Sequence, residues 1–156
     1  MNCSKSKHYP SLIGQSIENL EILAMSIGEL PYRGRQLFNW IYRKKVYNPT
    51  SMTDLPKLSQ EKLKIFSMHP LKILRTNSSS TKKTQKFLFM TKNGNTIESV
   101  LMNKGNHTTV CLSTQVGCAV DCSFCATAKM GFIQNLSAGE IIDQYLQLVK
   151  LSDNQI

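Results

Sequence analysis

The stretch TTVCLSTQVGCAVDCSFCATAKMGFIQNLSAGEIIDQYLQLV, residues 108–149, predicts a strand, a cysteine-rich loop and a helix, in that order. The β-branched run at 108–113 predicts a buried strand. Ser137 and Glu140 have the spacing of a capping box, and apolar residues at helical spacing follow as far as Val149. In β/α barrels, the loops after the C-terminal ends of strands carry the chemistry. The stretch therefore predicts the first strand–loop–helix unit of such a barrel, with the cysteines at the C-terminal end of the strand, where the active site lies.

Three of the five cysteines, Cys118, Cys122 and Cys125, are spaced as CxxxCxxC on this loop. Three thiolates can hold three irons of a cubane cluster and leave the fourth iron open to a ligand. Zinc is the alternative, because Cys111 or His107 would add a fourth ligand. A disulfide framework fits poorly, since it needs an oxidising compartment and usually an even number of cysteines. The loop is therefore interpreted as a metal site for iron–sulfur or zinc.

Residues before the loop predict helices first and strands later. Apolar residues at helical spacing predict three helices, at about 16–25, 33–46 and 58–68. Alternating patterns predict three strands, at 72–75, 85–91 and 96–102, with Asn93-Gly-Asn between the last two as a hairpin turn. The expected fold is α+β leading into α/β, in three parts: a helical domain over 11–70, a β-hairpin connection over 71–103, and the start of a barrel over 104–156.

The composition favours a polyanionic partner. The 156 residues are 41% hydrophobic, and 19 Lys and Arg stand against 10 Asp and Glu, for a formal net charge of +9. Such a charge favours binding to phosphates by counterion release, which suits RNA and also a membrane surface. The sequence contains neither a signal-peptide pattern nor an apolar run near eighteen residues. We therefore expect a cytoplasmic protein without a membrane segment.

A basic cluster with aromatic residues lies in the second predicted helix and beside it. It comprises Arg33, Arg35, Arg43, Lys44 and Lys45, with Tyr32, Trp40, Tyr42 and Tyr47 among them. Such a mixture can bind phosphates and stack on unpaired bases. The competing interpretation is a solvated basic face with Trp40 in the core, since Trp40 is at helical spacing from other apolar residues. Both interpretations stay open at this point.

The segment from Val110 to Phe132, VCLSTQVGCAVDCSFCATAKMGF, closely resembles the cluster-binding segment of the radical S-adenosylmethionine (SAM) RNA methyltransferases of the RlmN/Cfr family. Asn135-Leu136 and Glu140-Ile-Ile extend the likeness. The resemblance implies a [4Fe-4S] cluster on Cys118, Cys122 and Cys125 and SAM as the second cofactor. It also implies that the barrel is the partial TIM barrel of a radical SAM core. In the RlmN branch, which we favour, the implied reaction methylates carbon 2 of an adenine in 23S rRNA and of an adenine next to the tRNA anticodon. The Cfr branch would methylate adenine carbon 8.

The resemblance also assigns roles to two residues outside the loop. Glu98 shares a strand face with Val100 and Met102, where partial burial would help it exchange protons, although an exposed strand glutamate is the ordinary interpretation. The family's proton-accepting glutamate occupies the matching place. Cys111 would otherwise be an inert thiol in a buried strand. It matches the cysteine that resolves a covalent protein–RNA intermediate by a transient disulfide with a methyl-carrying cysteine near the C-terminus.

The resemblance further implies partners: 23S rRNA, tRNA and an electron donor such as flavodoxin or ferredoxin. The helical domain would help to hold RNA, and we expect a monomer. In the implied mechanism one SAM methylates the C-terminal cysteine and a second is cleaved at the open iron, which activates the methyl group.

The sequence departs from the family pattern because it stops early. The SAM-binding residues and the methyl-carrying cysteine are expected beyond Ile156. We therefore predict that these residues alone have no methyltransferase activity. Two other classes stay open: a non-catalytic RNA-interaction module stapled by zinc or a cluster, and a helical RNA-binding or adaptor unit.

Overall fold

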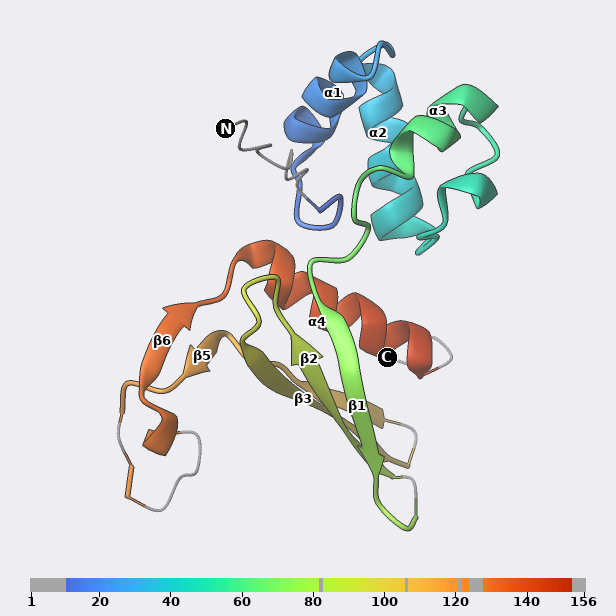
Figure 1. The fold of residues 1–156 in the computed structure, drawn as a ribbon. Helices are drawn as coiled ribbons and strands as arrows, with labels where there is room; N and C mark the ends of the chain where they lie inside the picture. Colours follow the sequence, from blue (N-terminus) through green and yellow to red (C-terminus); the bar gives the residue numbers. More distant parts are fainter. Residues whose placement is uncertain (1–10, 82, 106, 121, 124–127, 153–156) are drawn as a thin grey trace. The chain divides into compact units, whose positions relative to one another are not determined.

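The computed structural model describes residues 11–81, 83–105, 107–120, 122–123 and 128–152. Two compact units make up this part of the chain, the first ending at His69 and the second beginning at Pro70 (Figure 1). Cys125, the third predicted cluster ligand, lies outside the described residues. The division into three parts stays a prediction, and both the strands of 71–103 and the residues after them lie in the second unit.

Helices form the first unit. They are α1 (Ile17–Ser26), α2 (Tyr32–Phe38), the π-helical turn η1 (Asn39–Arg43), the 3₁₀ turn η2 (Pro49–Ser51) and α3 (Lys57–Leu63). Ser16 caps α1, accepting a hydrogen bond from the backbone N–H of Asn19 at 3.2 Å. The three predicted helices are confirmed, but the second and third end earlier than predicted. The second stops because Lys45 takes a left-handed backbone conformation, with φ of 54°.

The first two helices pack backbone to backbone. Gly34 of α2 is buried against α1, and a Cβ atom built on it would lie 2.4 Å from the backbone nitrogen of Glu21. Contacts below 3 Å to backbone atoms are not tolerated in folded proteins. Only glycine therefore fits where α1 and α2 meet.

The second unit is built on an antiparallel sheet in the order β1-β2-β3-β4. Its strands are β1 (Lys72–Ser78), β2 (Thr84–Met90), β3 (Thr96–Lys104) and β4 (His107–Cys111). The predicted hairpin between β2 and β3 is confirmed: the N–H of Thr91 donates to the carbonyl of Asn95 at 2.8 Å, and Gly94 has φ of 82°. All three strands predicted before residue 103 are present.

The strand predicted at 108–113 differs from its prediction. β4 runs antiparallel to β3, with His107 opposite Lys104, and its residues alternate between exposed and half-buried. Gly105, with φ of 61°, supports the tight return from β3. The prediction of a buried barrel strand here is wrong for the described residues, because β-branched side chains suit an edge strand as well as a buried one.

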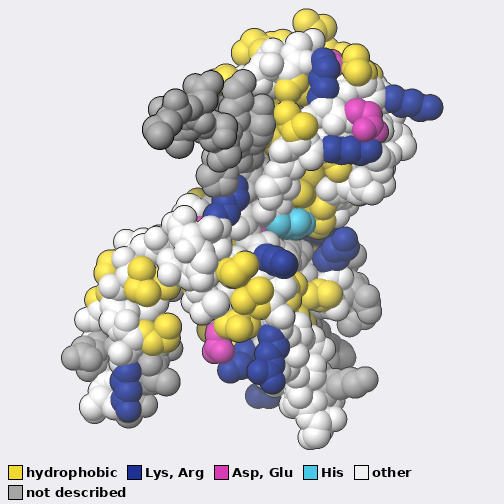
Figure 2. Space-filling model, viewed as in Figure 1, with side chains coloured by type: hydrophobic (Ala, Val, Ile, Leu, Met, Phe, Trp, Pro, Cys, Tyr) yellow, Lys and Arg dark blue, Asp and Glu magenta, His cyan; other side chains and the backbone are white. Residues whose placement is uncertain are grey.

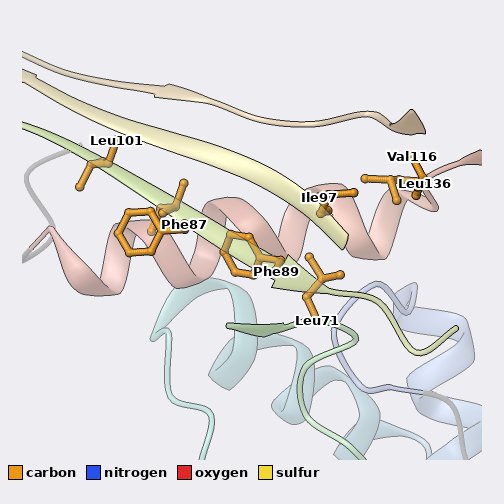
Figure 3. Close-up of a cluster of buried hydrophobic side chains, with 8 residues drawn as sticks. Leu71, Phe87, Phe89, Ile97, Leu101, Val116 and Leu136 are labelled. Atoms are coloured by element: carbon orange, nitrogen blue, oxygen red, sulfur yellow. The ribbon is translucent and has the colours of Figure 1, made fainter. Parts of the chain in front are cut away.

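Helix α4 (Ala138–Leu151) covers one face of the sheet. Both hydrogen bonds of the predicted capping box between Ser137 and Glu140 are present, which confirms this helix start. Figure 3 shows Phe87 and Phe89 of β2 lying along α4. The buried hydrophobic cluster consists of Leu71, Phe87, Phe89, Ile97, Leu101, Val116, Leu136 and Leu148.

Candidate metal centre

A two-stranded ribbon holds the two ends of the cysteine loop together. β5 (Gln115–Gly117) pairs antiparallel with β6 (Phe132–Asn135), and the 3₁₀ turn η3 (Ala128–Met130) precedes β6. The sequence did not predict this ribbon. Its strands are only three and four residues long, too short to show an alternating pattern.

Gly117 allows the ribbon to close. Its φ is 73°, and a Cβ atom built on it would lie 1.7 Å from the carbonyl oxygen of Gly131. The next residue, Cys118, donates its backbone N–H to that same oxygen at 3.1 Å. The first predicted ligand is therefore fixed by backbone contacts at the closed base of the loop.

Cys118 and Cys122 are half-buried free thiols. Within the described parts of the chain, no three His, Cys, Asp or Glu side chains come together as a metal site. Cys111 and His107 thus do not complete a zinc site with Cys118 and Cys122. The loop thiols Cys118 and Cys122, with Cys125 outside the described residues, are donors of the kind that iron–sulfur clusters use.

The face of the sheet opposite α4 carries both residues that the resemblance singled out. Cys111 pairs with Val100, and residues at a spacing of two share a face, so Cys111, Val100 and Glu98 lie on one side. Glu98 and Cys111 are diagonal neighbours, a relation that places residues roughly 7–8 Å apart. The structure therefore brings these two residues together from adjacent strands.

The partial burial predicted for Glu98 is not found. Its side chain is 53% exposed and forms an ion pair with Lys86, with 2.9 Å between Nζ and Oε1. The inward-facing positions of β3 are taken by Ile97, Ser99 and Leu101, so the alternation turns Glu98 outward. Cys111 is exposed as well, and as a free thiol it gives no support to a disulfide.

An open pocket of about 250 Å³ connects Glu98 to the base of the cysteine loop. Glu98 contributes one wall, and Gly117 and Met130, which flank the loop, contribute another. Figure 2 shows hydrophobic, basic and acidic side chains side by side over the sheet, and further hydrophobic ones over the ribbon. The pocket is lined by Leu88, Thr96, Ile97, Glu98, Ser113, Gln115, Gly117 and Met130.

The surroundings of Trp40 in the first unit show whether it belongs to the core or to a surface that could stack a base. Trp40 is 7% exposed, its indole N–H donates to the carboxylate of Asp54, and Lys44 Nζ lies 3.4 Å from its ring centroid. The interpretation of Trp40 as a core residue is therefore confirmed. It is not a free surface for stacking a base.

The arginines of the cluster differ in their surroundings. Arg33 donates to the carbonyl of Asp54 at 2.8 Å, and Arg35 pairs with Glu21 at 2.6 Å. Arg43 is exposed, and so is Lys44 above its tryptophan. Arg43 and Lys44 are therefore the cluster residues best placed for a phosphate.

Within the described residues, the structure has no helix long and apolar enough to cross a membrane.

Comparison with known proteins agrees with the resemblance. Residues 11–68 match the family model described as the ribosomal RNA large subunit methyltransferase N-terminal domain. The chain is 46% identical over 134 residues to the "probable dual-specificity RNA methyltransferase RlmN" of Aquifex aeolicus, covering 85% of this chain and 38% of that protein. It is 42% identical over 147 residues to the protein of the same name from Thermotoga maritima, covering 94% of this chain and 43% of that protein.

A solved structure supports the same assignment. A radical SAM methyltransferase from Sphaerobacter thermophilus is 40% identical and superposes with a TM-score of 0.82, covering 92% of this chain and 42% of that one. The chain spans about two fifths of the length of the relatives it matches. The chain therefore belongs to the RlmN family of radical SAM methyltransferases and corresponds to the N-terminal part of its relatives.

Proposed function

We propose that this chain is the N-terminal part of an RlmN-type enzyme that methylates carbon 2 of adenine in 23S rRNA and in tRNA next to the anticodon. The observation that carries the proposal is the closed β5–β6 ribbon. It fixes Cys118 directly after Gly117, and Gly117 and Glu98 both line the pocket. A loop of cluster ligands next to a carboxylate would bring radical chemistry and a general base to one place.

Cys118, Cys122 and Cys125 would hold the [4Fe-4S] cluster, and residues from 104 onward would form the start of the radical SAM core. When bound, the cluster would supply an electron for SAM cleavage at its open iron. This chain's own contribution is to hold the loop. Gly117 permits the close approach of β5 to β6, and the Cys118 N–H contact to Gly131 keeps the first ligand at a fixed place.

Glu98 would accept the proton that leaves the adenine ring. Its carboxylate lies at the open pocket, where a flat ring can approach, and the ion pair with Lys86 orients it. Cys111 would release the product from its covalent bond to the protein. Its exposed thiol lies on the same sheet face as Glu98, so both groups can reach one bound base. The cysteine with which Cys111 would form a transient bond is expected in the part of the relatives' length that this sequence does not span.

The proposal includes the partners expected from the family. The net charge of +9 supports binding of 23S rRNA and tRNA, and exposed Arg43 and Lys44 supply phosphate contacts in the first unit. An electron donor such as flavodoxin or ferredoxin would reduce the cluster, and the protein would act as a cytoplasmic monomer. We propose that methylation needs the remaining length found in the relatives, so that the 156 residues alone bind the cluster without catalysing the reaction. Methylation at carbon 8 is the alternative outcome for the complete enzyme.

The metal content of cysteine variants tests this proposal. The chain is purified without oxygen, supplied with iron, sulfide and zinc together, and analysed for bound metal. We expect iron with matching sulfide in the wild type, and its loss in Cys118→Ala, Cys122→Ala and Cys125→Ala. Cys111→Ala is the matched control and keeps its iron. Zinc in place of iron, lost in Cys111→Ala as well, would refute the cluster and favour a non-catalytic zinc module.

A further inference from the structure

A fully buried glutamine on α4 contacts the segment that joins Cys111 to Cys118. Gln144 is 0% exposed. Its side-chain Oε1 accepts from the N–H of Ser113 at 2.9 Å, and its Nε2 donates to the carbonyl of Ser113 at 2.9 Å. The amide therefore pairs with both backbone groups of one residue, as a neighbouring strand would.

That pairing fills a gap in the backbone hydrogen bonds. β4 ends at Cys111 and β5 begins at Gln115, so 112–114 lie between strands. Backbone groups away from water need partners, and a segment without a strand neighbour must find them elsewhere. Gln144 supplies both for Ser113.

Two further contacts tie the same point to β3. The hydroxyl of Ser99 donates to Gln144 Oε1 at 2.6 Å, and the hydroxyl of Ser113 donates to the carbonyl of Glu98 at 2.7 Å. Helix, strand and connecting segment thus meet at one network of hydrogen bonds. Glu98 belongs to it, Cys111 lies two residues before Ser113, and Cys118 lies five residues after it.

We propose that Gln144 is a positioning residue, which fixes the 112–117 connector so that Cys111, Cys118 and Glu98 keep constant relative places. The inference rests on the proposed function for its chemical meaning, since Gln144 does not line the pocket and acts through the two residues that it holds, Ser113 and Ser99. A glutamine that merely fills the core would not control this segment in particular.

Hydrogen exchange of the metal-free chain, followed residue by residue by NMR, tests the proposal. In the wild type, the Ser113 amide is expected to be protected, because Gln144 accepts its hydrogen bond. Gln144→Met keeps the shape and removes the polar atoms. It should speed exchange of Ser113 about tenfold or more while amides in the centre of β2 stay at the wild-type rate. The matched control is Gln147→Met on the same helix, because Gln147 donates to the carbonyl of Leu71 instead. It should leave Ser113 unchanged.

The loaded protein gives a second readout. Gln144→Met should change the line shape of the reduced cluster in electron paramagnetic resonance at equal iron content, and Gln147→Met should not. An unprotected Ser113 amide in the wild type, or equal effects of the two variants on Ser113, would overturn the inference. If Gln144→Met does not fold, Gln144→Glu replaces it; it keeps the oxygen that accepts from the Ser113 N–H and loses the donor to the Ser113 carbonyl, so a smaller increase is expected. A wild-type chain that takes up no iron would defeat the proposed function, while Ser113 exchange would still decide the role of Gln144.

Discussion

Replacing Gly117 by alanine perturbs the closed base of the cysteine loop. The new Cβ would lie 1.7 Å from the carbonyl oxygen of Gly131, and the residue would hold φ of 73°. The left-handed conformation costs about 1–2 kcal/mol for a residue with a Cβ. Loss of the Cys118 N–H bond to Gly131 adds about 1 kcal/mol. The closed ribbon should therefore lose about 2–3 kcal/mol of stability relative to the open one, before any cost of the clash itself. This shifts the equilibrium between the closed and the open ribbon by roughly 30- to 150-fold.

Gly131→Ala is the matched control on the same ribbon. Gly131 has φ of 68°, but no atom of the described residues lies within 4 Å of a Cβ built there. It shares the backbone strain without the clash. After anaerobic reconstitution we expect Gly117→Ala to lose most of its iron, Gly131→Ala to lose clearly less, and the melting of the sheet to change little in either. Equal iron in the two variants would refute the reasoning that closure of the ribbon positions Cys118.

Three shorter predictions concern the first unit. Gly34→Ala should lower the free energy of unfolding by about 1–3 kcal/mol in urea denaturation, because its Cβ meets the backbone of α1; unchanged stability would contradict this packing. The pKa of Glu18 is held below its ordinary value, first by its own backbone N–H and then by the Ser16 hydroxyl. Its stabilising effect on α1 is thus complete above the unfolded pKa and lost as the pH falls through the folded one. Glu18→Gln should remove that acid-dependent loss of helix ellipticity, and an unaltered pH profile would exclude Glu18 as its cause. Replacing Arg43, Lys44 and Lys45 together should weaken RNA binding. It should also lower the slope of log affinity against log salt concentration by up to about three units. An unchanged slope would mean that these residues are solvated surface.

The elements that could be predicted from the sequence are those with a local signal. Ser137 and Glu140 mark the start of α4, Asn93-Gly-Asn marks a hairpin, and both are confirmed because caps and tight turns depend on neighbouring residues. The burial of β4 could not be predicted, since it depends on which strand lies beside it.

The candidate site was only partly predictable for the same reason. The spacing of the loop cysteines predicts them as ligands, and the register of β3 and β4 brings Glu98 and Cys111 to one face. The role of Gln144 has no signal in its own neighbourhood, because its partners, Ser99 and Ser113, are 45 and 31 residues away. Long-range hydrogen bonds of this kind follow from the fold and not from local sequence.

Mössbauer spectroscopy of the chain reconstituted with iron-57 tests the central claim most directly. Three cysteine ligands leave one iron of a cubane different from the other three. We predict a [4Fe-4S] spectrum in which about one iron in four differs from the other three, and Cys118→Ala should abolish the spectrum. A spectrum that Cys118→Ala leaves unchanged, or a chain that takes up zinc and no iron, would contradict the account.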